Sequence, residues 1–216
     1  WVLAALVARC VKGDRCGKGD DIRYWGPPFW RNTSTMFHTY NRGKKSLEVD
    51  LKDAEQVSAL RDWIVSDADV VLQNLRPGVV KRAGLDATTL CAINPELIYC
   101  NVRAYGDAGP LRDQPGYDPL MQAFSGLMSV TGEPRQRPVR VGTSIIDKGT
   151  GLWCVIGILT MLEQRHSTGR GGVVDTTLLE TALAWMGVHV TDLEATGDVP
   201  IAEGSGVRGI APYQAY

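Results

Sequence analysis

The chain has 216 residues, of which 44% are hydrophobic and 22% charged, and its 23 basic and 24 acidic side chains give a net charge of −1. This apolar content excludes an intrinsically disordered chain, and the near-zero charge argues against a dedicated nucleic-acid binder, which usually carries a basic excess. No run approaches 18 consecutive apolar residues, so we expect no membrane span.

The first half of the chain alternates predicted strands with predicted helices. Polar and apolar residues alternate over 46–51, as in a half-buried strand, and Asp53 can cap a helix over 53–66. Apolar runs bounded by turn residues predict strands at 69–74 and 97–102. Short helices are predicted between these two strands, at 79–83 and 87–93. Strands that alternate with helices imply an α/β fold with a doubly wound, mostly parallel sheet.

The second half is predicted to carry two long apolar helices. Gly, Pro and charged residues are frequent in 106–142, which we expect to cross the surface. The remaining predicted elements are a helix over 150–164, a strand at 172–175 and a helix over 178–193.

The five cysteines are scattered without a C-x-x-C pair, at Cys10, Cys16, Cys91, Cys100 and Cys154. We expect buried free thiols in a reducing compartment, hence a cytoplasmic protein, or a mitochondrial one if the source is eukaryotic. The three histidines have no metal-binding spacing, so we expect no metal site. The chain opens on Trp1 with what resembles the end of a helix, and we expect a fragment of a longer protein.

Basic and amide side chains follow the predicted strands at their carboxyl ends, where open parallel sheets bind ligands. They are Arg15, Lys44, Lys45, Lys52, Asn74, Arg76, Lys81 and Arg82. Arginine offers bidentate contacts and lysine a point charge to a phosphate, so a site for a phosphorylated ligand is one interpretation. A solvated charged rim is the other, and the pattern leaves both open.

The stretch VGTSIIDKGTG (141–151) places Asp147 before two glycines and the predicted apolar helix. The Asp147 carboxylate can cap that helix. The same position suits a carboxylate nucleophile, because the glycines leave room for a substrate beside it. Both roles stay open on the residues alone.

Seven stretches, in family order, resemble the class III CoA-transferases, which include formyl-CoA transferase and carnitine CoA-transferase. They are WGPPFW (25–30), NRGKKSLEVDLK (41–52), ADVVLQNLRPGVVKRAGLD (68–86), INPELIYCNVRAYGDAGPLRDQPGYD (93–118), SGLMSVTGE (125–133), PVRVGTSIIDKGTGLW (138–153) and HSTGRGGVVDTTLLETAL (166–183). They cover nearly the whole chain. The final PYQAY (212–216) is most similar to the succinate–hydroxymethylglutarate branch.

The resemblance implies an enzyme that moves CoA from an acyl-CoA thioester to a free carboxylic acid. Asp147 stands at the family's nucleophile position, where the carboxylate forms an acyl-aspartyl anhydride and then an aspartyl-CoA thioester. Its partners would be an acyl-CoA and a carboxylic acid, with no nucleic acid and no membrane. CoA thioester would be a co-substrate, and no cofactor would be tightly bound.

The resemblance also implies a set of substrate-binding residues: Arg15, Val49, Lys52, Asn74, Leu75, Arg82 and Tyr117. In this set Arg15 and Arg82 would meet CoA phosphates, Val49 and Leu75 would flank the adenine, and Tyr117 would line the acyl pocket.

The resemblance further implies a domain organisation. Residues 1–211 would be part of a large, Rossmann-like CoA-binding α/β domain that is incomplete at both ends. Residues 212–216 would begin the linker to a second domain that is missing. Because family members are interlocked homodimers, we expect the same assembly for the full-length protein.

Two alternatives remain. One is an α-methylacyl-CoA racemase of the same fold, in which a histidine base stands at the position of Tyr117. A phenol with a reference pKa of about 10 is a poor base at neutral pH, which favours the transferase. The other alternative is a truncated remnant without catalytic activity.

Overall fold

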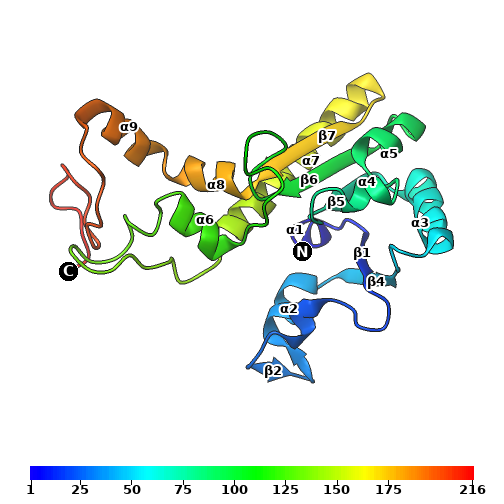
Figure 1. Cartoon of the computed structure of the whole chain (residues 1–216), viewed down its shortest axis with the longest axis horizontal. Coiled ribbons are helices and arrows are strands. Elements are labelled where there is room, and N and C mark those ends of the chain that lie inside the picture. The colour runs from blue at the N-terminus through cyan, green and yellow to red at the C-terminus, as the bar shows by residue number, and fades with distance from the viewer. The chain divides into compact units, whose positions relative to one another are not determined.

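The computed structural model describes all 216 residues and divides into two compact units. Unit 1 comprises Trp1–Asp69 and Val79–Leu97, and unit 2 comprises Val70–Gly78 and Ile98–Tyr216. Each unit has its own parallel strands and its own flanking helices (Figure 1).

Unit 1 contains a two-stranded parallel sheet. Strands β1 (Cys10–Asp14) and β4 (Lys44–Glu48) pair in register, and an antiparallel hairpin of β2 (Phe29–Trp30) and β3 (Thr33–Ser34) lies between them in the chain. The helices of this unit are α1 (Val2–Ala5), the 3-10 helix η1 (Asp21–Tyr24), α2 (Thr35–Asn41), α3 (Ala54–Asp67), α4 (Val79–Arg82) and α5 (Ala87–Ile93).

Aspartates begin both α3 and α5. The Asp53 carboxylate accepts the backbone N–H of Glu55 at 2.9 Å and of Gln56 at 3.1 Å, and the Asp86 carboxylate accepts that of Thr89 at 3.2 Å. These caps satisfy N–H groups that have no partner within the helix, which confirms the predicted role of Asp53. The buried apolar side chains of unit 1 are Val57, Ile64, Leu85, Leu90 and Leu97.

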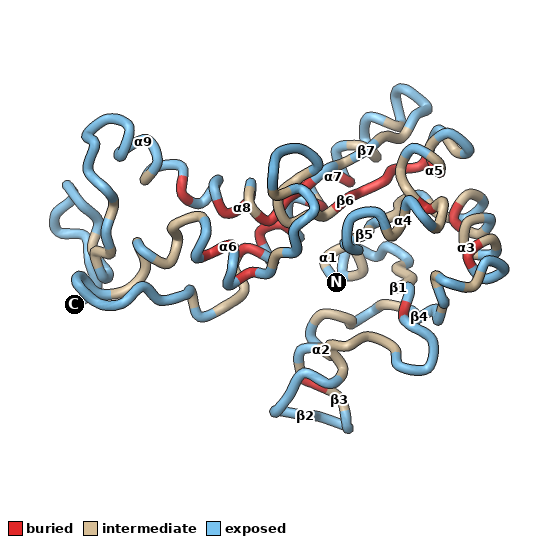
Figure 2. Tube along the Cα trace, in the orientation of Figure 1, coloured by how far each residue is buried: buried red, intermediate tan, exposed pale blue.

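Unit 2 is built on three parallel strands in the order β5–β6–β7. The central strand has four consecutive buried residues, from Ile98 to Asn101, as expected where both faces of a sheet are covered. Figure 2 shows this buried stretch along β6. The elements of unit 2 are β5 (Val70–Gln73), β6 (Ile98–Arg103), α6 (Asp118–Phe124), α7 (Ile145–Thr168), β7 (Gly172–Thr177), α8 (Leu178–Trp185) and α9 (Gly187–Thr196).

Glycines let α7 approach the sheet and α8 closely. A Cβ atom on Gly157 would lie 2.5 Å from Cγ1 of Val174 on β7, and one on Gly149 would lie 2.9 Å from Cγ2 of Thr181 on α8. The hydrophobic core between α6, α7 and α8 consists of Met121, Ile146, Leu178 and Ala182. The amino-terminal end of α7 is therefore fixed by packing on two other helices.

Helix α7 is 24 residues long, and its length and composition would allow it to cross a membrane. In the structure it contacts β6, β7 and α8, which is the position of a helix that covers a sheet. Gly169 ends it in the left-handed region with φ 66°, where its N–H donates to the Arg165 carbonyl at 2.8 Å.

The predicted parallel α/β architecture is confirmed, but three details of the helices are wrong. The helix predicted over 178–193 is two helices, because Met186 leaves helical geometry with ψ 2° and ends α8. The helix predicted over 150–164 begins five residues earlier, at Ile145. The segment 106–142 does not only cross the surface, since it contains α6 with three buried residues.

All five cysteines are free, as predicted. Burial is confirmed only for Cys100 and Cys154, which lie in the core of unit 2. Cys10 and Cys91 are half-buried, and Cys16 is exposed, because it follows the end of β1.

Candidate active site

Asp147 lies inside the first turn of α7 and is not its cap. The N-cap is Ser144, whose side chain makes no capping hydrogen bond, so the cap interpretation of Asp147 is wrong. The Asp147 side chain reaches solvent. Its carboxylate is therefore available to a substrate at the positive end of a 24-residue helix.

The pKa of Asp147 is raised to about 6, first by partial removal of water from the carboxylate and second by the negative charge of Asp118. A carboxylate with this pKa is still mostly ionised at neutral pH. It is also more basic than an ordinary aspartate, which favours attack on a carbonyl carbon. Perturbed carboxylates of this kind are typical of functional sites.

The true cap of α7 is supplied by another helix. Asp118, at the start of α6, is 2% exposed, and its Oδ2 accepts the backbone N–H of Ile146 at 2.8 Å and of Asp147 at 3.1 Å. Its Oδ1 accepts a hydrogen bond from Nε2 of Gln122. Asp118 thus holds the backbone of Asp147 in place and also raises the pKa of its carboxyl group.

Gln122 connects this cap to the segment before α7. Its side chain is fully buried, and its Oε1 accepts the backbone N–H of Val141 at 2.8 Å. Thr150 fixes the next turn of α7, because its hydroxyl donates to Oγ1 of Thr181 on α8 at 2.8 Å. Buried polar groups that are fully paired in this way make a rigid support.

Sequence reasoning missed Asp118 and Gln122. The available signal was the Asp118-Pro119 pair, because proline is favoured in the first turn of a helix and aspartate near its start. That signal predicts the start of α6. It does not predict that the Asp118 carboxylate caps α7, which begins 27 residues later, at Ile145.

Tyr117 immediately precedes Asp118 and is the N-cap residue of α6. Its side chain is 64% exposed. Because Asp118 binds the backbone N–H of Asp147, the structure brings Tyr117 and Asp147 to the same end of unit 2.

Asn74 and Leu75 lie in the exposed loop that follows β5. A polar chain across the three strands anchors this loop: Oε1 of Gln73 accepts the Leu75 N–H at 2.9 Å, and Nε2 of Gln73 donates to Asn101 at 2.7 Å. Asn101 in turn donates to Asp175 at 2.9 Å. Asn74 and Leu75 therefore lie at the carboxyl end of β5, as predicted.

A cavity of about 390 Å³ in unit 2 adjoins the same loop. Its lining residues are Arg76, Pro77, Asp113 and Pro115. The guanidinium of Arg76 gives this cavity a phosphate-binding group.

Four predicted site residues belong to unit 1. Arg15 and Val49 directly follow the paired residues Asp14 and Glu48, so the structure brings them together at the carboxyl ends of β1 and β4. Lys52 is exposed three residues after Val49. Arg82, the last residue of α4, is also exposed, and no hydrogen bond or ion pair joins it to the other three.

Arg15 is only weakly engaged. Its Nη2 lies 3.2 Å from Oδ2 of Asp21, and both side chains are largely exposed. An exposed pair of this kind contributes little to stability, so the guanidinium can exchange it for a phosphate.

The family model for CoA-transferase family III matches residues 1–216. Among curated relatives, the human succinyl-CoA:glutarate CoA-transferase is 36% identical, with 99% of this chain and 49% of the relative covered. The acetyl-CoA:oxalate CoA-transferase of Acetobacter aceti is 38% identical, with 100% of this chain and 55% of the relative covered. The chain thus spans about half the length of the curated relatives it matches.

Two solved structures also resemble this chain, and each of them is longer than it. A CAIB/BAIF family protein from Brucella suis superposes with a TM-score of 0.90 at 37% identity, over 99% of this chain and 58% of that chain. Rv3272 from Mycobacterium tuberculosis superposes with a TM-score of 0.78 at 28% identity, over 90% of this chain and 54% of that chain.

Proposed function

The chain belongs to CoA-transferase family III, and we propose that it moves CoA from an acyl-CoA thioester to a free carboxylic acid through a covalent intermediate on Asp147. The observation that carries this proposal is the Asp147 carboxylate itself. It is exposed, has no hydrogen-bond or ion-pair partner, and has a pKa raised to about 6, while its backbone N–H is held by a buried carboxylate.

The proposed reaction has four steps. The Asp147 carboxylate attacks the thioester carbonyl, which forms an acyl-aspartyl anhydride and releases CoA thiolate. The thiolate attacks the aspartyl carbonyl, which forms an aspartyl-CoA thioester and releases the donor acid. The acceptor carboxylate then attacks this thioester, and the returning thiolate cleaves the second anhydride to give the new acyl-CoA and free Asp147.

This chain's residues would contribute in different ways. Asp147 supplies the nucleophilic oxygen, and Asp118 with Gln122 keeps its helical turn from shifting during the covalent steps. Gly149 would contribute through packing, because a Cβ atom at this position would lie 2.9 Å from Thr181 and 3.0 Å from Trp185 on α8.

For CoA, we propose contacts from residues that follow parallel strands at their carboxyl ends. In unit 1 these are Arg15, Val49 and Lys52, with Arg82 from α4, and in unit 2 they are Asn74 and Leu75. The arginines would bind phosphates, because a guanidinium pairs with a phosphate through two hydrogen bonds. CoA would be a co-substrate and no tightly bound cofactor would be needed.

For the acyl group, we propose a dicarboxylic acid. The relatives in humans and in Agrobacterium fabrum are named for succinyl-CoA or succinate and glutarate. Tyr117 would line the acyl pocket, where its exposed hydroxyl can donate a hydrogen bond. Residues 1–211 would belong to the CoA-binding domain, with a linker from residue 212.

We also propose that the full-length protein is a homodimer. Large apolar side chains on α7, α8 and α9 are exposed in this chain, among them Leu152, Ile156, Trp185 and Val188. Exposed apolar side chains on three successive helices are what a protein–protein interface would cover. Light scattering coupled to size-exclusion chromatography measures the assembly directly.

Covalent trapping tests the mechanism. The purified protein is incubated with a panel of acyl-CoAs, digested and analysed by mass spectrometry for an adduct on the peptide that contains Asp147. The matched control is Asp192→Asn, which removes an exposed carboxylate from α9. An adduct in the wild type and in Asp192→Asn, but not in Asp147→Asn, supports the proposal; transfer activity in Asp147→Asn refutes it.

A further inference from the structure

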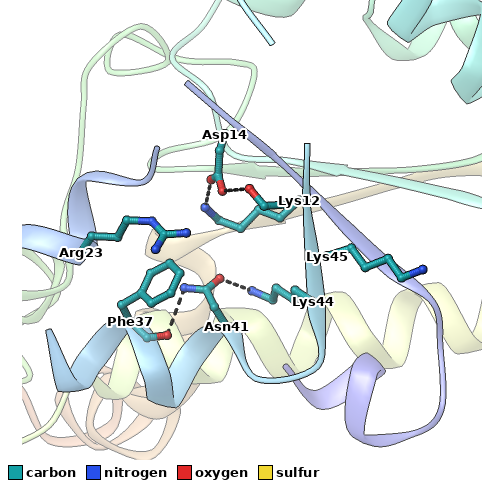
Figure 3. A pocket seen from close by; sticks show the side chains of 8 residues that line it. Lys12, Asp14, Arg23, Phe37, Asn41, Lys44 and Lys45 are labelled. Atoms are coloured by element: carbon teal, nitrogen blue, oxygen red, sulfur yellow. Dashed lines mark hydrogen bonds and ion pairs between the residues drawn. The ribbon is translucent and has the colours of Figure 1, made fainter. Parts of the chain in front are cut away.

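Unit 1 contains a cavity of about 210 Å³ that shares no residue with the CoA contacts proposed above. Figure 3 shows the side chains around it. They come from β1, η1, α2 and β4, and are Lys12, Asp14, Arg23, Phe37, Asn41, Lys44, Lys45 and Ser46.

The one carboxylate in the cavity wall is already paired. Asp14 is 6% exposed, forms an ion pair with the ammonium of Lys12 and accepts the hydroxyl of Ser46 at 2.5 Å. Lys12 also binds Asp20, at 2.7 Å. These bonds and the nearby positive charge of Arg23 lower the pKa of Asp14 against the opposing effect of burial, so the group stays ionised at neutral pH.

Two cations around the cavity have no carboxylate partner. The guanidinium of Arg23 lies over the ring of Phe37, 3.9 Å from its centre, and makes no ion pair. The ammonium of Lys44 donates only to Oδ1 of Asn41, at 3.1 Å. Burial, the largest cause, and the charge of Lys12 lower the pKa of Lys44, and the opposing effects of Asp20 and Asp14 do not cancel this shift.

The charges around the cavity therefore do not balance. Lys12, Arg23 and Lys44 are positive, and Asp14 and Asp20 are negative. Lys45 lines the cavity, but its ammonium points away from it in Figure 3, as expected for the residue next to Lys44 on a strand. One positive charge remains uncompensated in a partly buried place, and a bound anion would neutralise it.

We propose that this cavity binds a small oxyanion, the carboxylate of an organic acid or inorganic phosphate, between Arg23 and Lys44. The chemistry of the two side chains suits such a ligand, because a guanidinium offers a planar fork of donors and an ammonium offers a point charge. Phe37 holds the guanidinium from one side and leaves its N–H edge for the ligand. The volume is well above the roughly 30 Å³ that one water molecule occupies in the liquid.

Isothermal titration calorimetry tests the proposal with two probes, sodium succinate and sodium phosphate, in separate titrations at constant chloride concentration. Because succinate also fits the proposed acyl pocket and phosphate the proposed CoA contacts, the binding event assigned to this cavity is the one that depends on Arg23 and Lys44. We expect at least one probe to show such an event, and the tighter probe identifies the class of oxyanion. Arg23→Gln and Lys44→Gln should each weaken binding about tenfold or more, because each removes a charged hydrogen-bond donor. The matched control Lys45→Gln loses the same charge from the same strand and should stay within about twofold, as a screened surface charge does.

Circular dichroism checks that each variant is folded. A second measurement needs no variant: in a ¹⁵N NMR titration of the wild type, the Nε–H signal of Arg23 should shift with the same affinity as the calorimetric event. No binding of either probe to the folded protein overturns the proposal. An equal loss of affinity in Lys45→Gln also overturns it, because that result would indicate attraction by general surface charge. An Arg23 signal that does not shift during the titration overturns it as well.

Discussion

Replacing Asp118 by asparagine removes one negative charge from beside Asp147 and changes one hydrogen-bond acceptor into a donor within a buried network. The new oxygen can still accept the N–H groups of Ile146 and Asp147, but the new amide faces Nε2 of Gln122, which is also a donor. If the Gln122 amide rotates, it loses its bond from the Val141 N–H. One buried polar group is left unpaired in either arrangement, which costs about 1–3 kcal/mol.

The double variant Asp118→Asn with Gln122→Glu is the matched control. It returns one carboxylate to the network, and that carboxylate can accept both the new amide and the Val141 N–H. We therefore expect most of the lost stability to return. Urea unfolding followed by circular dichroism measures both variants, and a shift of the midpoint at constant slope reports the change in stability.

The same substitution tests the electrostatic argument. Because the charge of Asp118 raises the pKa of Asp147, Asp118→Asn should move the acidic limb of the kcat profile from about pH 6 to lower pH. The limb should stay above the ordinary range of an aspartate, since loss of water is the larger cause of the shift. Wild-type stability together with an unmoved limb would refute the role given to Asp118, as would a double variant that is no more stable than the single one.

Four other variants, one of them with a matched control, test separate parts of the structure. Asp147→Asn should end transfer but should raise the melting temperature at pH values above about 6, because the folded state raises the pKa of Asp147 and so disfavours its charged form. This gain in stability should disappear below pH 3.8, the pKa in the unfolded chain, where the carboxyl group is protonated in both states. Equal melting temperatures of variant and wild type at neutral pH would contradict this. Arg82→Ala should raise KM for CoA esters and spare kcat, which steady-state kinetics measures. Gly157→Ala should destabilise the protein by about 1–3 kcal/mol in urea unfolding, whereas Gly151→Ala, whose Cβ would meet nothing within 4 Å, should not. Tyr117→Phe should lower transfer activity modestly, because it removes one neutral hydrogen bond. In heavy water, neither this variant nor the wild type should introduce deuterium at the α-carbon of a 2-methylacyl-CoA. Deuterium uptake by the wild type that is lost in Tyr117→Phe would favour the racemase.

Local signals were sufficient to predict most of the strands. The strands predicted at 69–74, 97–102 and 172–175 match β5, β6 and β7 to within two residues, because a strand buried in a parallel sheet needs only a short apolar stretch. The strand predicted at 46–51 is β4, which ends three residues earlier, at Glu48, and the two-residue strands β2 and β3 were not predicted. The Asp53 cap is equally local, since the carboxylate and the N–H groups it accepts lie within three residues. The same holds for the residues after β5, whose position at the carboxyl end follows from strand direction alone. Lys44 and Lys45, by contrast, do not follow a strand but begin β4.

The start of α7 could not be predicted from its own residues. Gly149 and Gly151 follow Asp147 closely, and two glycines within three positions disfavour a helix by about 1 kcal/mol each. What begins the helix at Ile145 is the carboxylate of Asp118, which comes from another element and accepts two of the otherwise unpaired N–H groups. Gly149 then has a packing role against Thr181 that becomes apparent only when α8 is in place.

The hydrogen bonds from the backbone of α7 to Asp118 also explain why Asp147 is a candidate nucleophile and not a capping residue. A carboxylate that caps a helix is occupied by backbone N–H groups, and those bonds lower its pKa and reduce its basicity. Because Asp118 performs the capping, the carboxylate of Asp147 has no hydrogen-bond partner and is exposed, with its pKa raised to about 6. Asp118, in a helix that the sequence did not predict, therefore excludes the capping role of Asp147, and the nucleophilic role stays a proposal that covalent trapping tests.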